Sequence, residues 1–196
     1  RDYKSQIERN KLKKKYTTED FLQNLELRAS ISHLDRGMVP RAVQLLSKTN
    51  QFNLTTKRHN QETLNNMLNN PNYILLMLSL SDKFGDQGEV GLCIATLNSK
   101  QEALIDSFLL SCRAIGRGAE YALLGALIKS IGSISCVLKA EYSPTLKNSI
   151  TEDFYTTVGM EVESRKDGII RYSMAMPANT KTPDWIDVKI KNKPPL

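Results

Sequence analysis

Cys112 and Asp106 are the residues whose types and spacing most suggest chemistry. Asp106 lies in the mostly apolar run 104–111, which predicts a strand, and Cys112 lies at its end. Strict alternation would place the two side chains on one face. A thiolate can accept an acyl group and pass it on, and a carboxylate in an apolar strand must be hydrogen-bonded or functional. The pair therefore offers a nucleophile and a general base. A buried structural cysteine, or a β-bulge that breaks the alternation, is the alternative.

A glycine-bearing loop follows, with the sequence CRAIGRG at 112–118, and then a helix with apolar residues at three- and four-residue spacing. The order strand, loop, helix aims backbone N–H groups and the positive end of a helix dipole at one point. Gly116 and Gly118 would let a ligand approach the backbone. The loop matches neither the three-glycine dinucleotide fingerprint nor the P-loop. We expect an anion there, best a pyrophosphate; a simple tight turn is the alternative.

Length and composition indicate one good-sized domain. The chain has 196 residues, of which 40% are hydrophobic, and no apolar run approaches the roughly 18 residues of a membrane span. We see no signal peptide. The chain begins with Arg1, so we expect a piece of a longer protein. Cys93, Cys112 and Cys136 show no metal-ligand spacing, and we expect reduced thiols in a cytoplasmic protein.

The basic charge lies at the two ends of the chain. The net charge is +6, of which residues 1–15 carry +5 and residues 181–196 carry +2, so that residues 16–180 are left with −1. A nucleic-acid footprint would place the excess on the folded body. We therefore expect solvated or linking ends, with residues 1–15 as a charged helix, and neither nucleic acid nor a membrane as a partner.

The periodicity along the chain predicts a mixed α/β fold with a mostly antiparallel central sheet flanked by helices. Thr17 or Thr18 should cap a first helix and Asp35 a second, and residues 85–88 should form a hairpin turn. The predicted strands are 27–32, 73–81, 89–97, 104–112, 134–140, 160–163 and 169–176, and the predicted helices are 19–25, 36–47, 62–69, 119–131 and 151–158.

Two motifs in this element order resemble the GNAT (N-acetyltransferase-like) superfamily over residues 26–176. The loop fits the acyl-CoA pattern Q/R-x-x-G-x-G/A, and NSITEDFYTTVGM at 148–160 fits a segment in which an Asn opens a helix ending in F-Y-x-x-x-G-F/M. The resemblance implies the GNAT fold and Tyr155 as general acid toward a leaving thiolate, or else as a ring packed on the sheet. The implied contacts to CoA or phosphopantetheine are Leu110, Arg113, Ile115, Gly116, Arg117, Gly118, Ala119 and Asn148. For Asn148, capping of the helix that follows it is the alternative.

Three longer segments resemble the C-terminal half of FkbH-like proteins: QLLSKTNQFNLTTKRH, SDKFGDQGEVG and DSFLLSCRAIGRGAEYALL. That family resembles enzymes that load a glyceryl unit onto the phosphopantetheine of an acyl carrier protein, with a haloacid-dehalogenase-like domain in front. The resemblance implies that domain and the carrier protein as partners. It also implies a helical connector at 1–25, the GNAT-like domain at 26–176 and a tail at 177–196. The D-x-D-x-T/V motif is missing, so we expect no metal in this chain.

The histidines His33 and His59 have no acidic or cysteine neighbour at ligand spacing, and we expect ordinary surface or loop residues. Residues 48–59 carry no generic chemical signature; only the family resemblance suggests that Asn50, Gln51 and Asn53 line an acyl pocket. Two functions therefore stay open. One is an acyltransferase for a short hydroxyacyl thioester, and the other is a non-catalytic module that docks pantetheine or a carrier protein.

Overall fold

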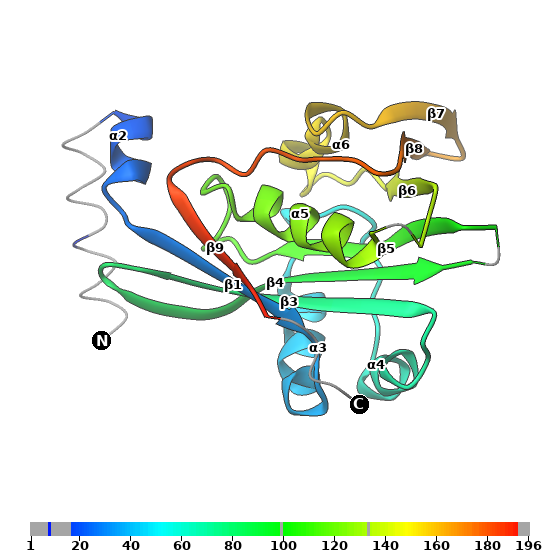
Figure 1. Cartoon of the computed structure of the whole chain (residues 1–196), viewed down its shortest axis with the longest axis horizontal. Coiled ribbons are helices and arrows are strands. Elements are labelled where there is room, and N and C mark those ends of the chain that lie inside the picture. Colours follow the sequence, from blue (N-terminus) through cyan, green and yellow to red (C-terminus); the bar gives the residue numbers. More distant parts are fainter. Residues whose placement is uncertain (1–7, 9–16, 99, 133, 192–196) are drawn as a thin grey trace.

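The computed structural model describes Glu8 and residues 17–98, 100–132 and 134–191, and one mixed β-sheet runs through them (Figure 1). Its order is β7-β8-β6-β5-β4-β3-β1-β9, and β2 pairs with β5 off this path. Neighbours are antiparallel except β5 with β6 and β1 with β9. The strands are β1 (Leu27–His33), β2 (Phe52–Asn53), β3 (Tyr73–Asp82), β4 (Gly85–Leu97), β5 (Glu102–Leu110), β6 (Val137–Tyr142), β7 (Glu161–Lys166), β8 (Ile169–Ala175) and β9 (Ile186–Ile190).

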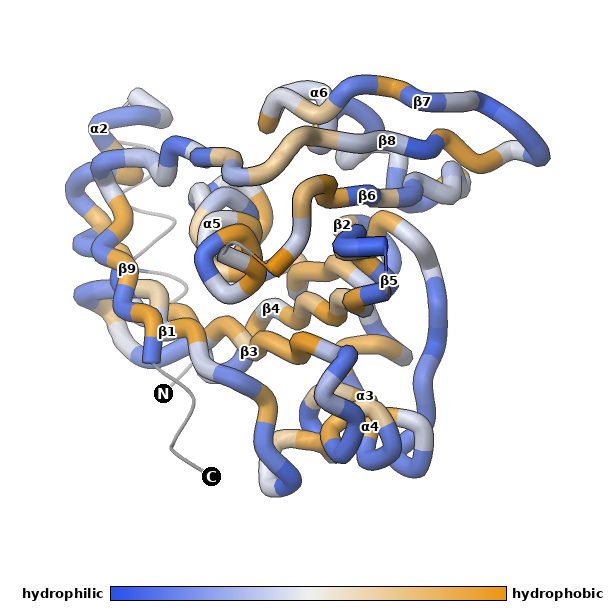
Figure 2. Tube along the Cα trace, turned by 45° about the vertical axis from the view of Figure 1, so that its right-hand side comes forward, coloured by the Kyte–Doolittle hydropathy of each residue, from blue (hydrophilic) through white to orange (hydrophobic). Residues whose placement is uncertain are grey.

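Helices cover both faces of the sheet and create two cores. On one face α3 and α4 pack over Met77, Leu92 and Leu109, and on the other α5 packs over a larger cluster that also receives α2 and α6. Figure 2 shows the apolar strands enclosed between these layers. The helices are α2 (Thr18–Gln23), η1 (Arg36–Met38), α3 (Val39–Lys48), α4 (Gln61–Leu68), α5 (Ala119–Ile131), η2 (Ser149–Thr151) and α6 (Phe154–Thr157).

The structure confirms the predicted fold class and the central position of the strand before the loop. Thr17 and Asp35 cap their helices as predicted, and α5 has the predicted bounds. The hairpin turn comes earlier than predicted, because β4 already begins at Gly85. The single helix predicted over 151–158 is wrong: η2 and α6 are separate. The charged helix predicted for residues 1–15 lies outside the described residues, except for Glu8.

Both ends of the predicted domain contribute further to the fold. Phe21, Leu22 and Leu25 of the predicted connector are buried in the α5-side core. At the other end, β9 extends the sheet by pairing with β1, and Trp185 packs against the same core. The sheet therefore continues beyond residue 176, where the predicted domain ended.

β5 contains a bulge at its candidate carboxylate. Ile94 pairs with Ser107 and Ala95 pairs with Ile105, so Asp106 has no partner on β4. A bulge inserts one residue and breaks the alternation of faces. In addition, the strand ends at Leu110, two residues before Cys112. The inference that Asp106 and Cys112 share a strand face is therefore wrong.

β5 and β6 part after four paired residues, and β2 fills the space between them. The parallel ladder ends at Ile105 opposite Ala140. Beyond it, Phe52 pairs with Leu110 and Asn53 with Leu109. The N–H of Leu54 donates to the carbonyl of Phe108 at 3.1 Å, and its carbonyl accepts from Ser143 N–H at 2.8 Å. Residues 52–54 thus bridge the two diverging strands.

Candidate functional site

A pocket of about 390 Å³ lies where the end of β5 meets the C-terminal end of α3. Among the described residues that line it, the charged ones are all basic and most of the others carry amides or hydroxyls. We call it the basic pocket. Its lining is Arg41, Gln44, Leu45, Lys48, Thr49, Asn50, Gln51, Leu110, Ser111, Cys112 and Arg113. Three positive charges and several hydrogen-bonding groups suit a small polar or anionic group.

Cys112 is exposed and lines this pocket, whereas Cys93 is buried in β4. Burial, and secondarily the charge of Asp106, hold the pKa of the Cys93 thiol well above its usual range, so Cys93 is inert. Cys136 is the other exposed thiol and donates to Gln101 at 3.3 Å. Cys112 is therefore the thiol that both meets solvent and faces a polar pocket.

The wall of the basic pocket is fixed by two arginines. Arg58 donates to the carbonyl of Thr49 at 3.1 Å and to the side chain of Asn50 at 2.8 Å. Arg41 donates through Nε and Nη2 to the carbonyl of Glu89 at 3.2 and 2.6 Å. The predicted acyl-pocket residues divide accordingly: Asn50 and Gln51 line the pocket, while Asn53 is fully buried.

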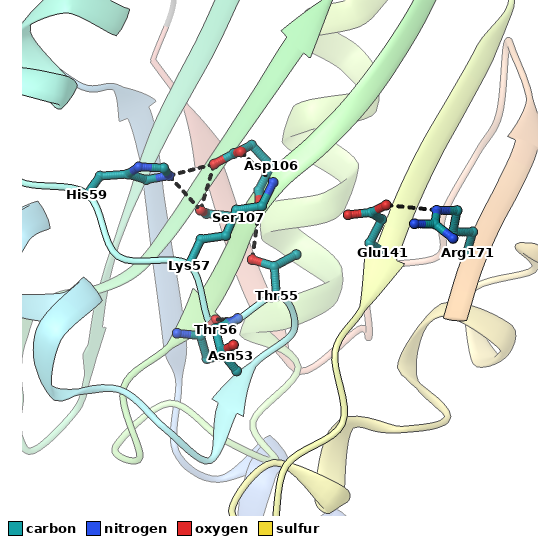
Figure 3. A network of polar contacts seen from close by, with 9 residues as sticks. All are labelled: Asn53, Thr55, Thr56, Lys57, His59, Asp106, Ser107, Glu141 and Arg171. Carbon is teal, nitrogen blue, oxygen red and sulfur yellow. Dashed lines mark hydrogen bonds and ion pairs between the residues drawn. The ribbon is translucent and has the colours of Figure 1, made fainter. Parts of the chain in front are cut away.

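Asp106 binds three side-chain donors rather than standing ready as a base (Figure 3). His59 Nε2 lies 2.6 Å from Oδ1, Lys57 Nζ lies 2.8 Å from Oδ2, and the Ser107 hydroxyl donates to Oδ1 at 2.9 Å. Burial raises the pKa of this carboxyl, but the hydrogen bonds from His59, Lys57 and Ser107 outweigh it and hold the pKa well below its usual range. A carboxylate so stabilised is a poor proton acceptor.

His59 is the site residue that the sequence interpretation missed. Its side chain is only 14% exposed, and it reaches Asp106 from 47 positions away in the chain. No local sequence spacing connects His59 with Asp106. The sequence indicated only that Asp106, as a carboxylate in an apolar strand, needs hydrogen-bond partners. Residues 52–59 follow directly after the pocket wall. Lys57 and His59 hold this segment against β5 through their contacts with Asp106.

Tyr155 and Asn148 are both committed to the protein interior. Tyr155 is 1% exposed, its hydroxyl has no hydrogen-bond partner among the described residues, and burial raises its pKa well above the usual value. Asn148 donates to the carbonyls of Asn53 and Ser143 at 2.9 and 3.0 Å and accepts from the N–H of Thr145 at 2.7 Å. Both amide protons of Asn148 are used, so none is left for a ligand.

The C-terminal segment covers half of the glycine loop. A Cβ on Gly118 would lie 3.0 Å from Pro183 and 3.3 Å from Trp185, whereas one on Gly116 would meet nothing within 4 Å. Trp185 also donates to the carbonyl of Arg117 at 3.0 Å. The Arg117 side chain lies 3.5 Å from Asp82 at the β3–β4 hairpin. Of the two loop arginines, Arg113 is the one that lines the basic pocket.

A carboxylate of the chain itself occupies the start of α5. Glu120 is 8% exposed, and its second oxygen has no hydrogen-bond partner among the described residues. Burial raises the pKa of Glu120, while the backbone N–H groups of Glu120 itself and of Gly118 act on its carboxyl in the opposite direction and lower the pKa. The Gly118 amide predicted to bind a phosphate therefore lies close to a carboxyl group of the chain itself.

A pantetheine arm does not fit between β5 and β6 in this structure. The backbone groups at Phe108, Leu109 and Leu110 that would face it are paired with residues 52–54. The predicted contact at Leu110 instead lies in the lining of the basic pocket. Ile115 is half-buried and Ala119 is buried at the first turn of α5.

The described residues show neither a metal-ion site nor a membrane-spanning helix. Within this part of the chain, no group of three or more His, Cys, Asp or Glu side chains could hold a metal ion. None of its helices is long and apolar enough to cross a membrane.

The comparisons with known proteins rest on structure, since no family model and no curated protein matches the sequence. The ribosomal-protein-S18-alanine N-acetyltransferase from Escherichia coli superposes with a TM-score of 0.58 at 15% identity, covering 79% of this chain and 98% of its own. Ard1 from Thermoplasma volcanium gives 0.57 at 13%, covering 75% and 97%. This is the GNAT fold.

A spermidine N-acetyltransferase SpeG variant from Vibrio cholerae gives a TM-score of 0.57 at 13% identity, covering 75% of this chain and 93% of its own. At these identities the likeness establishes the GNAT fold of this chain.

Proposed function

We propose that this domain is an acyltransferase in which the thiol of Cys112 accepts a short polar acyl group from a thioester and passes it to a second acceptor. One observation carries the proposal: Cys112 is an exposed thiol, two residues beyond the end of the central strand, in a pocket whose charged lining is basic. The GNAT fold supports the same reaction class.

The chemistry needs one nucleophile and one polar pocket. The sulfur of Cys112 attacks the thioester carbonyl carbon, a new C–S bond forms, and the bond to the donor sulfur breaks. The donor thiolate leaves and takes up the proton that Cys112 has lost. Lys48 and Arg113 attract an anionic substituent of the acyl group, and Gln44 and Gln51 offer hydrogen bonds to its hydroxyls. The reverse sequence at a second thiol completes the transfer.

The finer assignment rests on the FkbH-like sequence segments. We propose that the acyl group is a glyceryl unit, and that donor or acceptor is the phosphopantetheine of an acyl carrier protein. A haloacid-dehalogenase-like domain of a longer protein would be the second partner. Carrier proteins with an acidic surface would be attracted by Lys48 and Arg113 at the pocket. We place the protein in the cytoplasm, where thiols such as these three stay reduced.

A non-catalytic docking module is the second candidate, and the closed space between β5 and β6 favours it. A module of that kind would hold a carrier protein through the basic pocket without forming a bond to Cys112. The two functions differ in a single observable, the covalent acyl-enzyme.

Intact-mass analysis tests this difference. The protein is mixed with a glyceryl-loaded carrier protein, and separately with a glyceryl thioester of pantetheine. We expect a single added glyceryl mass on the parent and on the matched control Cys136→Ala, and none on Cys112→Ala. Charge reversal by Lys48→Glu should slow the adduct by about tenfold, whereas Lys166→Glu, on the exposed strand β7, should not. An unmodified parent under both donors would leave only the docking function.

A further inference from the structure

We propose that the thioester ligand binds with its arm outside the space between β5 and β6, and presents its acyl group end-on to the basic pocket. This inference rests on the proposed function and deepens it, because it fixes which part of the ligand the domain recognises. Three independent contacts within the chain support it.

The first contact is the bridge that β2 makes across the parting strands. Where β5 leaves β6, its outer edge would be open to an extended, amide-bearing ligand. Here Phe52 and Asn53 pair with that edge, and Leu54 bonds to Phe108 on one side and to Ser143 on the other. In Figure 3 the segment carrying Asn53 and Thr55 runs between β5 and the Glu141–Arg171 pair. The positions that a ligand amide would take are filled by peptide groups.

The second contact is the packing that holds this bridge in place. Phe52 is 5% exposed and Leu54 is fully buried. The ring of Phe52 lies 6.2 Å from that of Phe108 and 5.5 Å from that of Phe154, between ring centroids. Withdrawing β2 would expose both apolar side chains and break the hydrogen bond from Asn148 to Asn53. The bridge is thus part of the core and not a loose cover.

The third contact lies at the start of α5. The Glu120 carboxyl lies close to the backbone N–H of Gly118, and Pro183 and Trp185 pack on Gly118. An anion placed at this turn would face the acidic side chains of Glu120 and Asp184, which line the same pocket. Arg113, in contrast, is exposed and lines the basic pocket. The basic side chains that would attract an anionic group therefore lie in the basic pocket, where the acyl end of the ligand would bind.

The ligand class follows from this geometry. Recognition depends on the acyl group and the few atoms next to the thioester, so a truncated acyl-pantetheine should bind nearly as well as the acyl-CoA. A polar or anionic short acyl group should bind better than an apolar one of the same length, because three basic side chains and several amides line the pocket.

Amide hydrogen exchange tests the binding mode separately from acyl transfer. The probe is an unreactive thioether analogue of glyceryl-pantetheine, added to the full chain. We expect slower exchange or shifted signals at Ser111, Cys112 and Arg113, and no change at Leu54 and Ser143. Faster exchange at Leu54 and Ser143 on binding would overturn the inference while leaving the proposed function standing. No response at either set would mean that no thioester binds, and both would fall.

A pair of variants provides the second readout, the affinity for the same analogue. Phe52→Ala loosens β2, and Phe52→Leu retains an apolar side chain as the control. If β2 competed with the ligand for the same space, loosening β2 would raise the fraction of protein that is competent to bind. The affinity for the analogue would then increase by about tenfold or more. We expect unchanged or weaker binding in Phe52→Ala, since Gln51 in the pocket wall precedes it directly. Tightening in Phe52→Ala but not in Phe52→Leu would overturn the inference.

Discussion

Asn148 donates a side-chain hydrogen bond to the backbone carbonyl of Asn53 at 2.9 Å, across 95 positions of the chain. Asn148 is fully buried, so removing its amide leaves the carbonyls of Asn53 and Ser143 unpaired. We expect Asn148→Ala to lower the free energy of unfolding by about 2 to 4 kcal/mol, since an unpaired buried group costs about 1 to 3 kcal/mol. Chemical denaturation measures this. The exposed neighbour Lys147→Ala should be silent, and an equally mild effect of both changes would contradict the structural role.

The ionised carboxylate of Asp106 makes the folding stability depend on pH in the acidic range. Its folded-state pKa lies below the value of about 3.9 for an unfolded chain. The stabilisation is therefore fully present above about pH 4 and is lost as the pH falls through the folded-state pKa. Asp106→Asn should be less stable at neutral pH and should show a flatter decline in acid. Thermal unfolding between pH 2 and 7 tests this; parallel curves for parent and variant would contradict it.

Substitution of Tyr155 distinguishes a packing role of this side chain from a catalytic one. Its hydroxyl is buried without a partner among the described residues, and removing such a group recovers its desolvation cost. We expect Tyr155→Phe to keep the parent's stability or to gain up to about 1 kcal/mol, with unchanged acylation of Cys112. A large loss of transfer in a stable Tyr155→Phe protein would restore the general-acid assignment.

The two loop glycines should respond differently to alanine. Both have positive φ, 71° at Gly116 and 87° at Gly118, so both substitutions carry a backbone cost of about 1 kcal/mol or more. Gly118→Ala also meets Pro183 and Trp185 and should displace the C-terminal segment. Tryptophan fluorescence reports this, because Trp185 is the chain's single tryptophan. A shift in Gly116→Ala but not in Gly118→Ala would contradict the packing.

How far the sequence predicts this structure depends on the range of the interactions. α5 could be located because glycines flank an apolar 3.6-residue pattern, at Gly118 and Gly132. β2 could not, because a two-residue strand has no periodicity and owes its pairing to the divergence of two distant strands. The His59–Asp106 contact and the bulge at Asp106 are likewise tertiary features. Cys112 could be put forward as a candidate from the sequence because a strand-to-loop junction is a local feature.

Peptide mapping after reaction with a glyceryl thioester tests the central claim most directly. Cys112 and Cys136 are both exposed thiols, so the two cysteine peptides of one sample report pocket-assisted and ordinary reactivity side by side. We expect the glyceryl group on the Cys112 peptide in more than about tenfold excess over the Cys136 peptide, a difference of about 1.4 kcal/mol in activation free energy. The excess should vanish after unfolding in denaturant. Equal modification of the two peptides in the folded protein would contradict the claim that Cys112 is the acyl acceptor.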